Sequence, residues 1–303
     1  MKFLITGDCG FIGGNLAKSL ISEGHRILGY DNNSSSSVYH RIDGVEFVPI
    51  LTPAITGLDG IFHLGMASSS PMYKKNPYVI EDSIRTTLSV LELAKINKCP
   101  VVYASSSSLY NGNPPPYNEK MEIKVTDFYT ETRLFVERLF TLHDHLFEIP
   151  SAGLRFFSVF GPRDQYKGKY ANNITQFALS LMKGETPIVF GNGSQTRDFV
   201  HVDFVVQAMK RSMNLLLQDS ESFIVNVGSG KCLTFKELIK RLKDLTNSEI
   251  DETYIPNPID NYVKDTLADT TFMKKLLGIE YNTFDKDLKN HIKYLKRWKN
   301  AKG

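Results

Sequence analysis

The sequence contains few cysteines and no strong excess of charge of either sign. Its 303 residues include only Cys9, Cys99 and Cys232, an odd number without a Cys-x-x-Cys spacing or a nearby histidine pattern. This argues against a disulfide framework and a zinc site, predicts no metal, and favours a reducing compartment. The 36 Lys and Arg residues and the 33 Asp and Glu residues give a net charge of +3, spread along the chain. This distribution predicts neither a nucleic acid nor a membrane partner, and it is compatible with a small polyanion such as a nucleotide.

Long hydrophobic runs are also absent. No window approaches the roughly 20 consecutive apolar residues needed to cross a bilayer. The N-terminus has only three apolar residues in a row, Phe3 to Ile5, too few for the core of a signal peptide. We therefore expect a soluble, cytoplasmic protein. Neither a G-x-S-x-G nor a G-x-x-x-x-G-K-[ST] sequence occurs. These motifs are typical of hydrolases and of nucleoside triphosphatases, so the sequence does not favour either class.

Short apolar runs alternate with longer helical patterns in the first half of the chain. The runs predict strands over 2–6, 25–30, 60–64, 100–104 and 152–157, and the helical patterns cover 13–23, 79–97 and 128–147. This alternation is typical of βαβ units, and runs this apolar suit a parallel sheet covered on both faces. We therefore predict an α/β fold, a doubly wound parallel sheet of the Rossmann type with its ligand crevice at the carboxyl ends of the strands.

A G-x-x-G-x-x-G run follows the first predicted strand directly. It comprises Gly7, Gly10 and Gly13 and includes Phe11 and Ile12, and a predicted helix begins near Gly13. Glycines at these positions permit a tight turn, a close approach of the backbone to a pyrophosphate, and close packing of helix on strand. The helix N-terminus adds a positive dipole. The run therefore predicts a dinucleotide-binding loop; a glycine-rich turn without a ligand is the alternative.

Asp31 ends the second predicted strand, 24 residues after Gly7. A carboxylate at this place can accept hydrogen bonds from an adenosine ribose and would repel a 2'-phosphate, so NAD is favoured over NADP. No arginine follows immediately, the nearest one being Arg41. A solvated loop aspartate is the alternative interpretation.

Tyr129 and Arg133 lie four residues apart in the predicted helix 128–147 and therefore on one helix face. A fixed cation beside a phenol stabilises its phenolate form. Tyr129 is therefore a candidate base, although such a pair taken alone is more often a surface or packing feature.

Beyond about residue 162 the alternation loosens, which predicts a smaller C-terminal lobe. A helix is expected within 166–184, a strand over 187–190, a helix over 202–217, an apolar run over 222–227 and a helix over 233–245. The predicted domains are a nucleotide-binding Rossmann domain over 1–165, completed by about 199–228, and a substrate-binding lobe over 166–303, mainly 166–198 and 229–303.

The order of these motifs along the chain resembles that of the extended short-chain dehydrogenase/reductases. The glycine run, Asp31, the segment 62–67, the serines leading into Tyr110, Tyr129, and the segments 154–162, 191–203 and 226–230 follow the family order. The chain looks closest to the NAD-dependent epimerase/dehydratase branch, in particular to UDP-glucose 4-epimerase-like proteins. The resemblance covers nearly the whole chain.

The resemblance implies roles for particular residues. Tyr129 would be the proton shuttle, Ser106 would bond the sugar hydroxyl, and Arg133 stands where the family has lysine. The resemblance further implies cofactor contacts from Gly7, Gly10, Phe11, Ile12, Gly13, Asp31, Asn32, Asn33, Leu64, Met66, Ser83, Tyr129, Arg133 and Phe157. It implies substrate contacts from Ser106, Ser158, Asn172, Phe190 and Arg197.

The implied activity is NAD-dependent 4-epimerisation of a nucleotide sugar, of the UDP-glucose/UDP-galactose type, through a transient 4-keto sugar. Dehydratases of the family carry Asp and Glu after the Ser or Thr, where this chain has Ser107 and Ser108, which lack the required acidity. Two alternatives stay open: a nucleotide-sugar reductase or oxidase, and a non-catalytic NAD-binding relative, because Arg133 is not a conservative replacement for lysine. The family also implies a homodimer through the helices 79–97 and 128–147.

Overall fold

The computed structural model describes residues 1–34, 37–257 and 262–301. Its contacts divide the chain into two compact units. Unit 1 comprises Met1–Asn111, Glu122–Phe156 and Val206–Val225, and unit 2 comprises Gly112–Met121, Phe157–Val205 and Asn226–Gly303. The division by contacts falls after Phe156. The domain boundary near residue 165 separates the expected nucleotide-binding domain from the expected substrate-binding lobe, and it stays a prediction.

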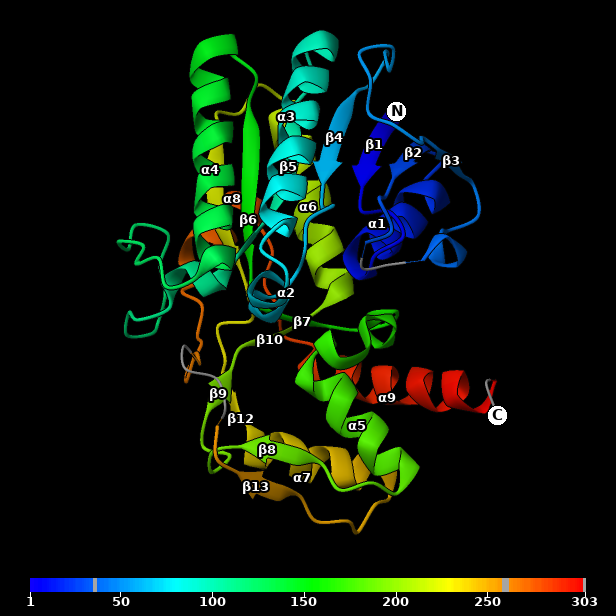
Figure 1. Ribbon diagram of the computed structural model, residues 1–303, viewed down its shortest axis with the longest axis vertical. Coiled ribbons are helices and arrows are strands. Elements are labelled where there is room, and N and C mark those ends of the chain that lie inside the picture. The colour runs from blue at the N-terminus through cyan, green and yellow to red at the C-terminus, as the bar shows by residue number, and fades with distance from the viewer. Residues whose placement is uncertain (35–36, 258–261, 302–303) are drawn as a thin grey trace. The chain divides into compact units, whose positions relative to one another are not determined.

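A seven-stranded sheet forms the centre of unit 1, in the order β11-β6-β5-β4-β1-β2-β3 (Figure 1). Neighbouring strands from β3 to β6 pair in parallel, as the apolar runs predict. The order runs outward in both directions from β1 and β4, so the predicted doubly wound sheet is confirmed. The strands are β1 (Lys2–Thr6), β2 (Arg26–Tyr30), β3 (Val45–Phe47), β4 (Gly60–His63), β5 (Val101–Ser106), β6 (Ser151–Phe156) and β11 (Phe223–Val227).

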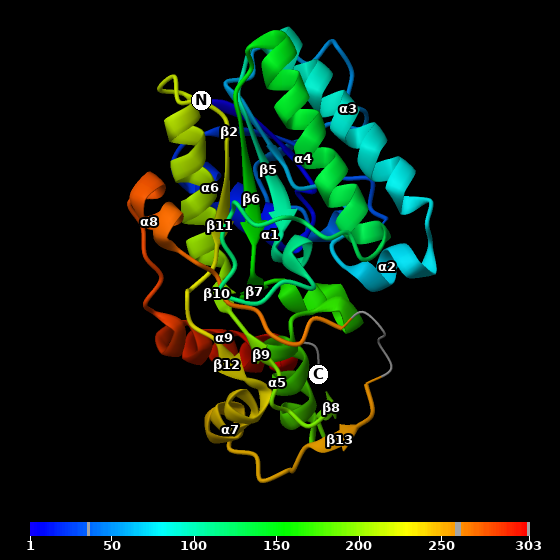
Figure 2. The same cartoon turned by 90° about the vertical axis from the view of Figure 1, so that its left-hand side faces the viewer.

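Helices cover both faces of this sheet. α3 (Val79–Asn97) and α4 (Phe128–Phe147) pack on each other on one face, with the short α2 (Ser70–Lys75) beside them. α6 (Val202–Leu216) lies on the opposite side of the strands (Figure 2). Lys210 of α6 pairs with Glu23 at the end of α1 (Phe11–Ser22), which places these two helices on the same face. Two short 3-10 helices, η1 (Val38–His40) and η2 (Ser107–Tyr110), follow β2 and β5.

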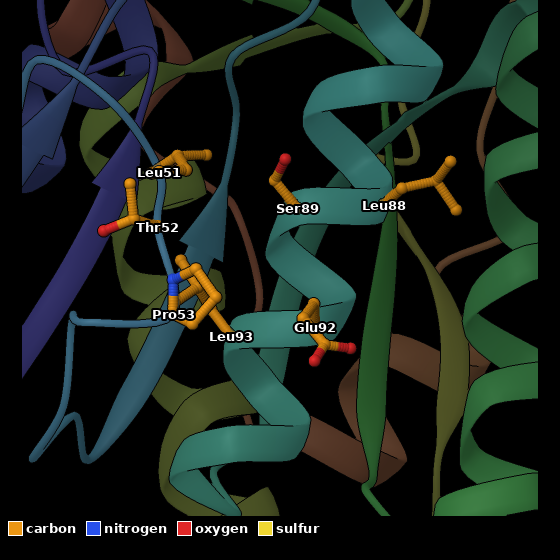
Figure 3. Close-up of a pocket in the computed structure, with 7 residues that line it drawn as sticks. All are labelled: Leu51, Thr52, Pro53, Leu88, Ser89, Glu92 and Leu93. Carbon is orange, nitrogen blue, oxygen red and sulfur yellow. The ribbon is translucent and has the colours of Figure 1, made fainter.

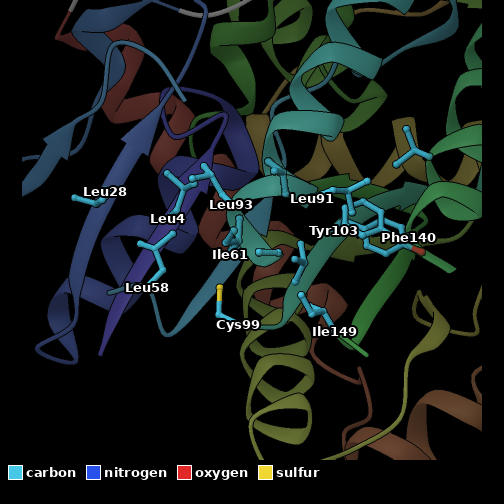
Figure 4. Packing of buried hydrophobic residues seen from close by; sticks show 14 of the residues in the cluster. Leu4, Leu28, Leu58, Ile61, Leu91, Leu93, Cys99, Tyr103, Phe140 and Ile149 are labelled. Carbon is cyan, nitrogen blue, oxygen red and sulfur yellow. The ribbon is translucent and has the colours of Figure 1, made fainter. Parts of the chain in front are cut away.

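The core between the sheet and the α3–α4 pair is continuous (Figure 4). Leu4, Ile61 and Val101 come from three neighbouring strands and are fully or almost fully buried. Tyr103 of β5 stacks on Phe140 of α4 with ring centroids 4.1 Å apart. Because these buried side chains pack closely, they fix the ends of the strands. The residues that follow β1, β2, β4 and β5 are therefore held on a rigid frame.

Unit 2 is built from short strand pairs and helices. β7 (Ser158–Phe160) pairs in parallel with β10 (Phe199–His201), β8 (Ile188–Phe190) pairs in parallel with β13 (Thr253–Ile255), and β9 (Thr196–Arg197) pairs antiparallel with β12 (Leu233–Thr234). Its helices are η3 (Asp164–Tyr170), α5 (Asn173–Lys183), α7 (Phe235–Thr246), α8 (Thr271–Leu277) and α9 (Phe284–Asn300). A separate core, including Phe160, Phe177 and Leu238, joins α5, α7 and α9. None of the described helices combines the length and the apolar composition needed to traverse a bilayer.

Candidate functional site

The glycine run forms the connection between β1 and α1, as the sequence predicts. Gly7 has φ +77°, and a Cβ there would lie 2.9 Å from the backbone of Gly65. A Cβ at Gly13 would overlap the carbonyl group of Gly7. Gly10 is the N-cap of α1 and offers no side-chain acceptor to the first helical turn. This bare helix N-terminus at the carboxyl end of a parallel strand fits the pyrophosphate of a dinucleotide.

Asp31 follows β2 in a tight turn. Its Oδ1 accepts a hydrogen bond of 2.8 Å from the backbone N–H of Asn33, whose φ is +56°. Asn32 makes the same kind of turn and accepts from the N–H of Ser34 at 3.1 Å. The Oδ1 atom of Asn33 is buried without a hydrogen-bond partner among the described residues. The turn therefore holds a carboxylate and an unsatisfied acceptor beside the glycine run, which fits a ligand that carries hydroxyl groups.

The end of β4 is tied to the end of β1 by Thr6. Its Oγ1 accepts from the N–H groups of Leu64 and Gly65 at 3.1 and 3.0 Å, and it lies 2.8 Å from Nδ1 of His63. Burial, with a smaller contribution from Arg133, lowers the pKa of His63 to about 3. His63 is therefore a neutral core residue.

Tyr129 and Arg133 lie at the start of α4, on the face that packs on the sheet. Asp127 caps this helix by accepting from the Thr130 N–H at 2.8 Å, while Thr130 returns a contact to the Asp127 N–H, so the sequence fixes where α4 begins. Both residues of the pair are buried, and the Cζ atom of Arg133 lies 5.1 Å from the centroid of the Tyr129 ring. The predicted shared helix face is therefore present.

Arg133 is held by two other segments of the chain. Its Nη2 donates to the carbonyl of Ala67 at 2.8 Å, and its Nη1 donates to Met66 Sδ at 3.1 Å and to the carbonyl of Ala104 at 3.4 Å. Burial alone lowers the pKa of Arg133, but the phenols of Tyr129 and Tyr73 raise it, and the net pKa is above its ordinary value. A charged guanidinium is thus fixed beside Tyr129.

Ser106 ends β5, two residues after the Ala104 carbonyl that Arg133 contacts. Its Oγ accepts from the N–H of Ser108 at 3.1 Å and so caps η2, which leaves its hydroxyl hydrogen to donate. The hydrogen bond to Ala104 therefore connects Arg133 of α4 to the strand end that carries Ser106. Arg133 thus links the ring of Tyr129 to the strand that ends at Ser106.

Ser83 of α3 is linked to Tyr129 through Tyr73. Its Oγ lies 3.2 Å from the Tyr73 hydroxyl group, and the Tyr73 ring packs edge-on against Tyr129 with centroids 5.4 Å apart. Ser83 also donates to the carbonyl of Val79 at 2.7 Å. It thus supports the side of Tyr129 that faces α2 and α3.

Four of the predicted substrate contacts lie in unit 2, where Ser158 and Asn172 contact each other. Asn172 Nδ2 donates to Ser158 Oγ at 2.9 Å and to the carbonyl of Val159 at 3.0 Å, while its Oδ1 caps α5 by accepting from Ile174 at 3.0 Å. Phe190 ends β8, and its carbonyl accepts from Gln195 at 2.6 Å.

Arg197 is the fourth predicted substrate contact in unit 2. Its guanidinium contacts two aromatic rings, with Cζ 5.0 Å from the centroid of Tyr262 and 5.5 Å from that of Phe235. It donates to the carbonyls of Lys264 at 2.9 Å and Thr196 at 2.7 Å. The neighbouring Asp198 instead accepts from the backbone around Ser229 and Ala268. Burial lowers the pKa of Arg197.

Phe157, a predicted cofactor contact, also falls in unit 2. Its N–H donates to the carbonyl of Val227 at 3.1 Å, and its ring centroid lies 6.3 Å from that of Tyr117.

An ion pair between Asp8 and Arg41 was not predicted. Asp8 lies inside the glycine run, is fully buried, and its Oδ2 lies 2.7 Å from Arg41 Nε. Asp8, Cys9 and Asp31 have potential ligand atoms within 4.8 Å of one another. Since Arg41 already neutralises one of the two carboxylates, this cluster offers little to a cation. The sequence signal for this pair was an acidic residue inside the glycine run, but its partner lies 33 residues away along the chain.

A surface pocket of about 260 Å³ lies between the segment after β3 and α3 (Figure 3). Leu51, Thr52, Pro53, Leu88, Ser89, Glu92 and Leu93 line it. Its charged lining residue, Glu92, is acidic, so the pocket does not suit a pyrophosphate.

Comparisons with known proteins agree with this geometry. Residues 3–228 match the model of the NAD dependent epimerase/dehydratase family. The sequence is 30% identical to UDP-glucuronate 4-epimerase of Thermodesulfobacterium geofontis, over 92% of this chain and 90% of the relative. The structure is similar to that of UDP-N-acetylglucosamine 4-epimerase from Methanobrevibacter ruminantium M1 in complex with UDP-N-acetylmuramic acid, with TM-score 0.91, 25% identity and 98% coverage of both chains. It is also similar to MoeE5 in complex with UDP-glucose and NAD, with TM-score 0.87, 25% identity, and coverage of 98% and 99%.

Proposed function

Because the chain belongs to the NAD-dependent epimerase/dehydratase family, we propose that it is a UDP-sugar 4-epimerase that uses NAD. The observation that carries this proposal is the buried Tyr129–Arg133 pair, since a phenol beside a fixed cation can act as a proton shuttle. Relatives are named for UDP-glucuronate and UDP-N-acetylglucosamine, and a structural neighbour binds UDP-glucose. These three nucleotide sugars are the candidate substrates.

The glycine run and Asp31 would hold NAD. When bound, NAD supplies a hydride acceptor and donor. The N-terminus of α1, capped by Gly10, would receive the pyrophosphate, and the Asp31 carboxylate would accept from the adenosine ribose. The segment that contains Leu64 and Met66 is fixed by Thr6 and by Arg133, so this side of the site is rigid before any ligand binds.

In the proposed reaction, Tyr129 takes the proton from the sugar 4-hydroxyl group and later returns it. Arg133 stabilises the phenolate, because its guanidinium lies against the ring and its charge is held by carbonyl groups rather than by a carboxylate. Ser106 donates its hydroxyl hydrogen to the reacting oxygen. Arg197 of unit 2 would bind the diphosphate, a role that suits a desolvated guanidinium. Ser158, Asn172 and Phe190 would contact the remaining parts of the substrate.

Replacement of Tyr129 by Phe tests this assignment. A positioned base contributes about 100-fold to 10,000-fold to the rate, so turnover should fall by that order while the affinity for NAD changes little. The measurement is the interconversion of UDP-sugar epimers by chromatography, together with titration calorimetry of NAD. Tyr103→Phe is the matched control, because Tyr103 is an equally buried tyrosine that stacks in the core. Wild-type turnover by Tyr129→Phe would refute the assignment.

Arg133 in place of the family lysine favours one alternative, a protein that binds NAD without catalysis. The two proposals differ in outcome: a chain that binds NAD but isomerises none of the three nucleotide sugars fits only the binding protein. Accumulation of reduced nicotinamide during turnover, measured by its absorbance, would instead support a reductase or oxidase.

We also propose a homodimer formed through α3 and α4. These helices pack side by side, and Leu88, Phe135, Leu142 and Leu146 leave large apolar side chains exposed on them. Leu142 and Leu146 are one helical turn apart and therefore lie on one face. Burial of such a patch against a second copy removes apolar surface from water. A cytoplasmic location stays a prediction.

A further inference from the structure

The ion pair between Asp8 and Arg41 lies where the adenosine end of a dinucleotide is expected. Asp8 is part of the loop after β1, and its carboxyl group lies over β2: a Cβ at Gly29 would be 2.6 Å from Asp8 Cγ and Oδ2. Gly29 is two residues before Asp31. The absence of a side chain at Gly29 therefore gives Asp8 its place beside Asp31.

Arg41 is fixed on Asp8 from the segment that precedes β3. Its Nε lies 2.7 Å from Asp8 Oδ2, and its Cζ lies 4.3 Å from the centroid of the Phe47 ring. The side chain is only 16% exposed. Burial raises the pKa of Asp8, and the hydrogen bond and charge of Arg41 act against that rise. The 2.7 Å contact thus pairs the guanidinium with the buried carboxyl group of Asp8.

Asp31 belongs to the same group of charges. Its carboxylate lies within 4.8 Å of that of Asp8, and it interacts electrostatically with Arg41. Asp8 Oδ1 and Arg41 Nη2 are both buried without a hydrogen-bond partner among the described residues. Two carboxylates and one guanidinium give this corner a formal charge of about −1, the same as that of a single aspartate.

We propose that Asp8 is a second determinant of nucleotide selectivity, which holds the Arg41 guanidinium and thereby denies it to the 2'-phosphate of NADP. This inference rests on the proposed use of NAD. Asp31 excludes a 2'-phosphate by repulsion, while Asp8 removes the cation that would offset that repulsion. Without Asp8, the corner would hold one carboxylate and a released guanidinium, an arrangement that can bind a phosphate.

The two members of the pair should have opposite effects on selectivity. Asp8→Asn changes the local charge from −1 to 0, so the ratio of the dissociation constants of NADP and NAD should fall by about 10-fold to 100-fold. Arg41→Gln changes the local charge to −2 and should raise the same ratio. The double variant restores a charge of −1, and its ratio should return to near the wild-type value. A pair with only a structural role would weaken both nucleotides in both single variants and would not give opposite signs.

The experiment is titration calorimetry of NAD and of NADP with the nucleotide-free full chain and each variant. Circular dichroism checks that each variant is folded. Glu46→Gln is the matched control, because it removes one negative charge from an exposed ion pair on β3, and its ratio should stay near that of the wild type. The inference is overturned if Asp8→Asn and Arg41→Gln move the ratio of the dissociation constants in the same direction. It is also overturned if Glu46→Gln changes that ratio as much as Asp8→Asn does. A wild-type chain that binds neither nucleotide would instead overturn the proposed function.

Discussion

The buried ion pair between Glu137 and Arg155 supports the strand end that carries Ser106. Arg155 of β6 donates from Nη2 to Glu137 Oε2 at 2.7 Å and from Nε to Oε1 at 2.9 Å. Glu137 Oε1 also accepts from Ser105 Oγ at 2.5 Å, and Arg155 Nη1 donates to the Tyr110 hydroxyl at 2.8 Å. The side chains of the pair are only 3% and 4% exposed. Four hydrogen bonds therefore join α4, β5, β6 and η2.

Replacement of Glu137 by Gln should strongly lower the free energy of unfolding. The substitution keeps the shape but leaves the Arg155 guanidinium buried without its counter-charge, which costs about 3–5 kcal/mol. The exposed pair between Arg26 and Glu46 is the internal reference, because its nitrogen and oxygen atoms are also 2.7 Å apart but its side chains are 64% and 54% exposed. Glu46→Gln should cost about 0–1 kcal/mol. Urea unfolding followed by far-ultraviolet circular dichroism measures both.

A third variant separates lost charge compensation from lost packing. Glu137→Leu with Arg155→Met replaces both charges by apolar groups of similar volume, and such replacements are often neutral or stabilising. We expect the double variant to be more stable than Glu137→Gln alone. The reasoning is refuted if Glu137→Gln costs no more than Glu46→Gln, because burial would then not set the cost of the unpaired charge.

Two further predictions concern pH and assembly. Burial lowers the pKa of His63 to about 3 from 6.5, so between these pH values the unfolded chain binds a proton that the folded chain does not, and stability falls as the pH falls. His63→Gln should flatten this dependence of the free energy of unfolding on pH, measured by urea unfolding. Equal slopes for wild type and His63→Gln would contradict the prediction. The double variant Leu142→Glu with Leu146→Glu should be a monomer in light scattering, because the two charges disrupt the proposed interface. Ile188 in unit 2 is similarly exposed, and Ile188→Glu should leave the proposed dimer intact. A dimer formed by the double variant would exclude this interface.

The long elements of unit 1 were predictable because each has a local signal. β1 and the helices α3 and α4 have the predicted bounds, since apolar periodicity marks their interiors. The shortest strands of unit 2, β9 and β12, contain two residues each and form only because a partner lies beside them. No periodic pattern can appear in two residues. α9 is different, because Leu288, Ile292 and Leu295 carry a helical spacing that the sequence prediction did not use.

The arrangement of the candidate site residues was predictable where it depends on spacing along the chain, and not where it depends on pairing between distant segments. Gly7, Asp31 and the Tyr129–Arg133 pair follow from order and period along the chain. The contact between Asp8 and Arg41 depends on how the segment between β2 and β3 returns to the sheet, which the sequence pattern does not specify. The same holds for Arg133 and Ala67, which are 66 residues apart.

The contacts of Arg133 show how an arginine is accommodated at the position where the family has lysine. Its hydrogen bonds run to the carbonyls of Ala67 and Ala104 and to the Met66 sulfur, so its position beside Tyr129 is set by the protein itself. A lysine ammonium is a compact charge, whereas the planar guanidinium can donate to several groups at once. In this chain the cation is therefore in place before any ligand arrives. The role proposed for Arg133 requires a positive charge beside Tyr129, and its guanidinium lies 5.1 Å from the centroid of that ring.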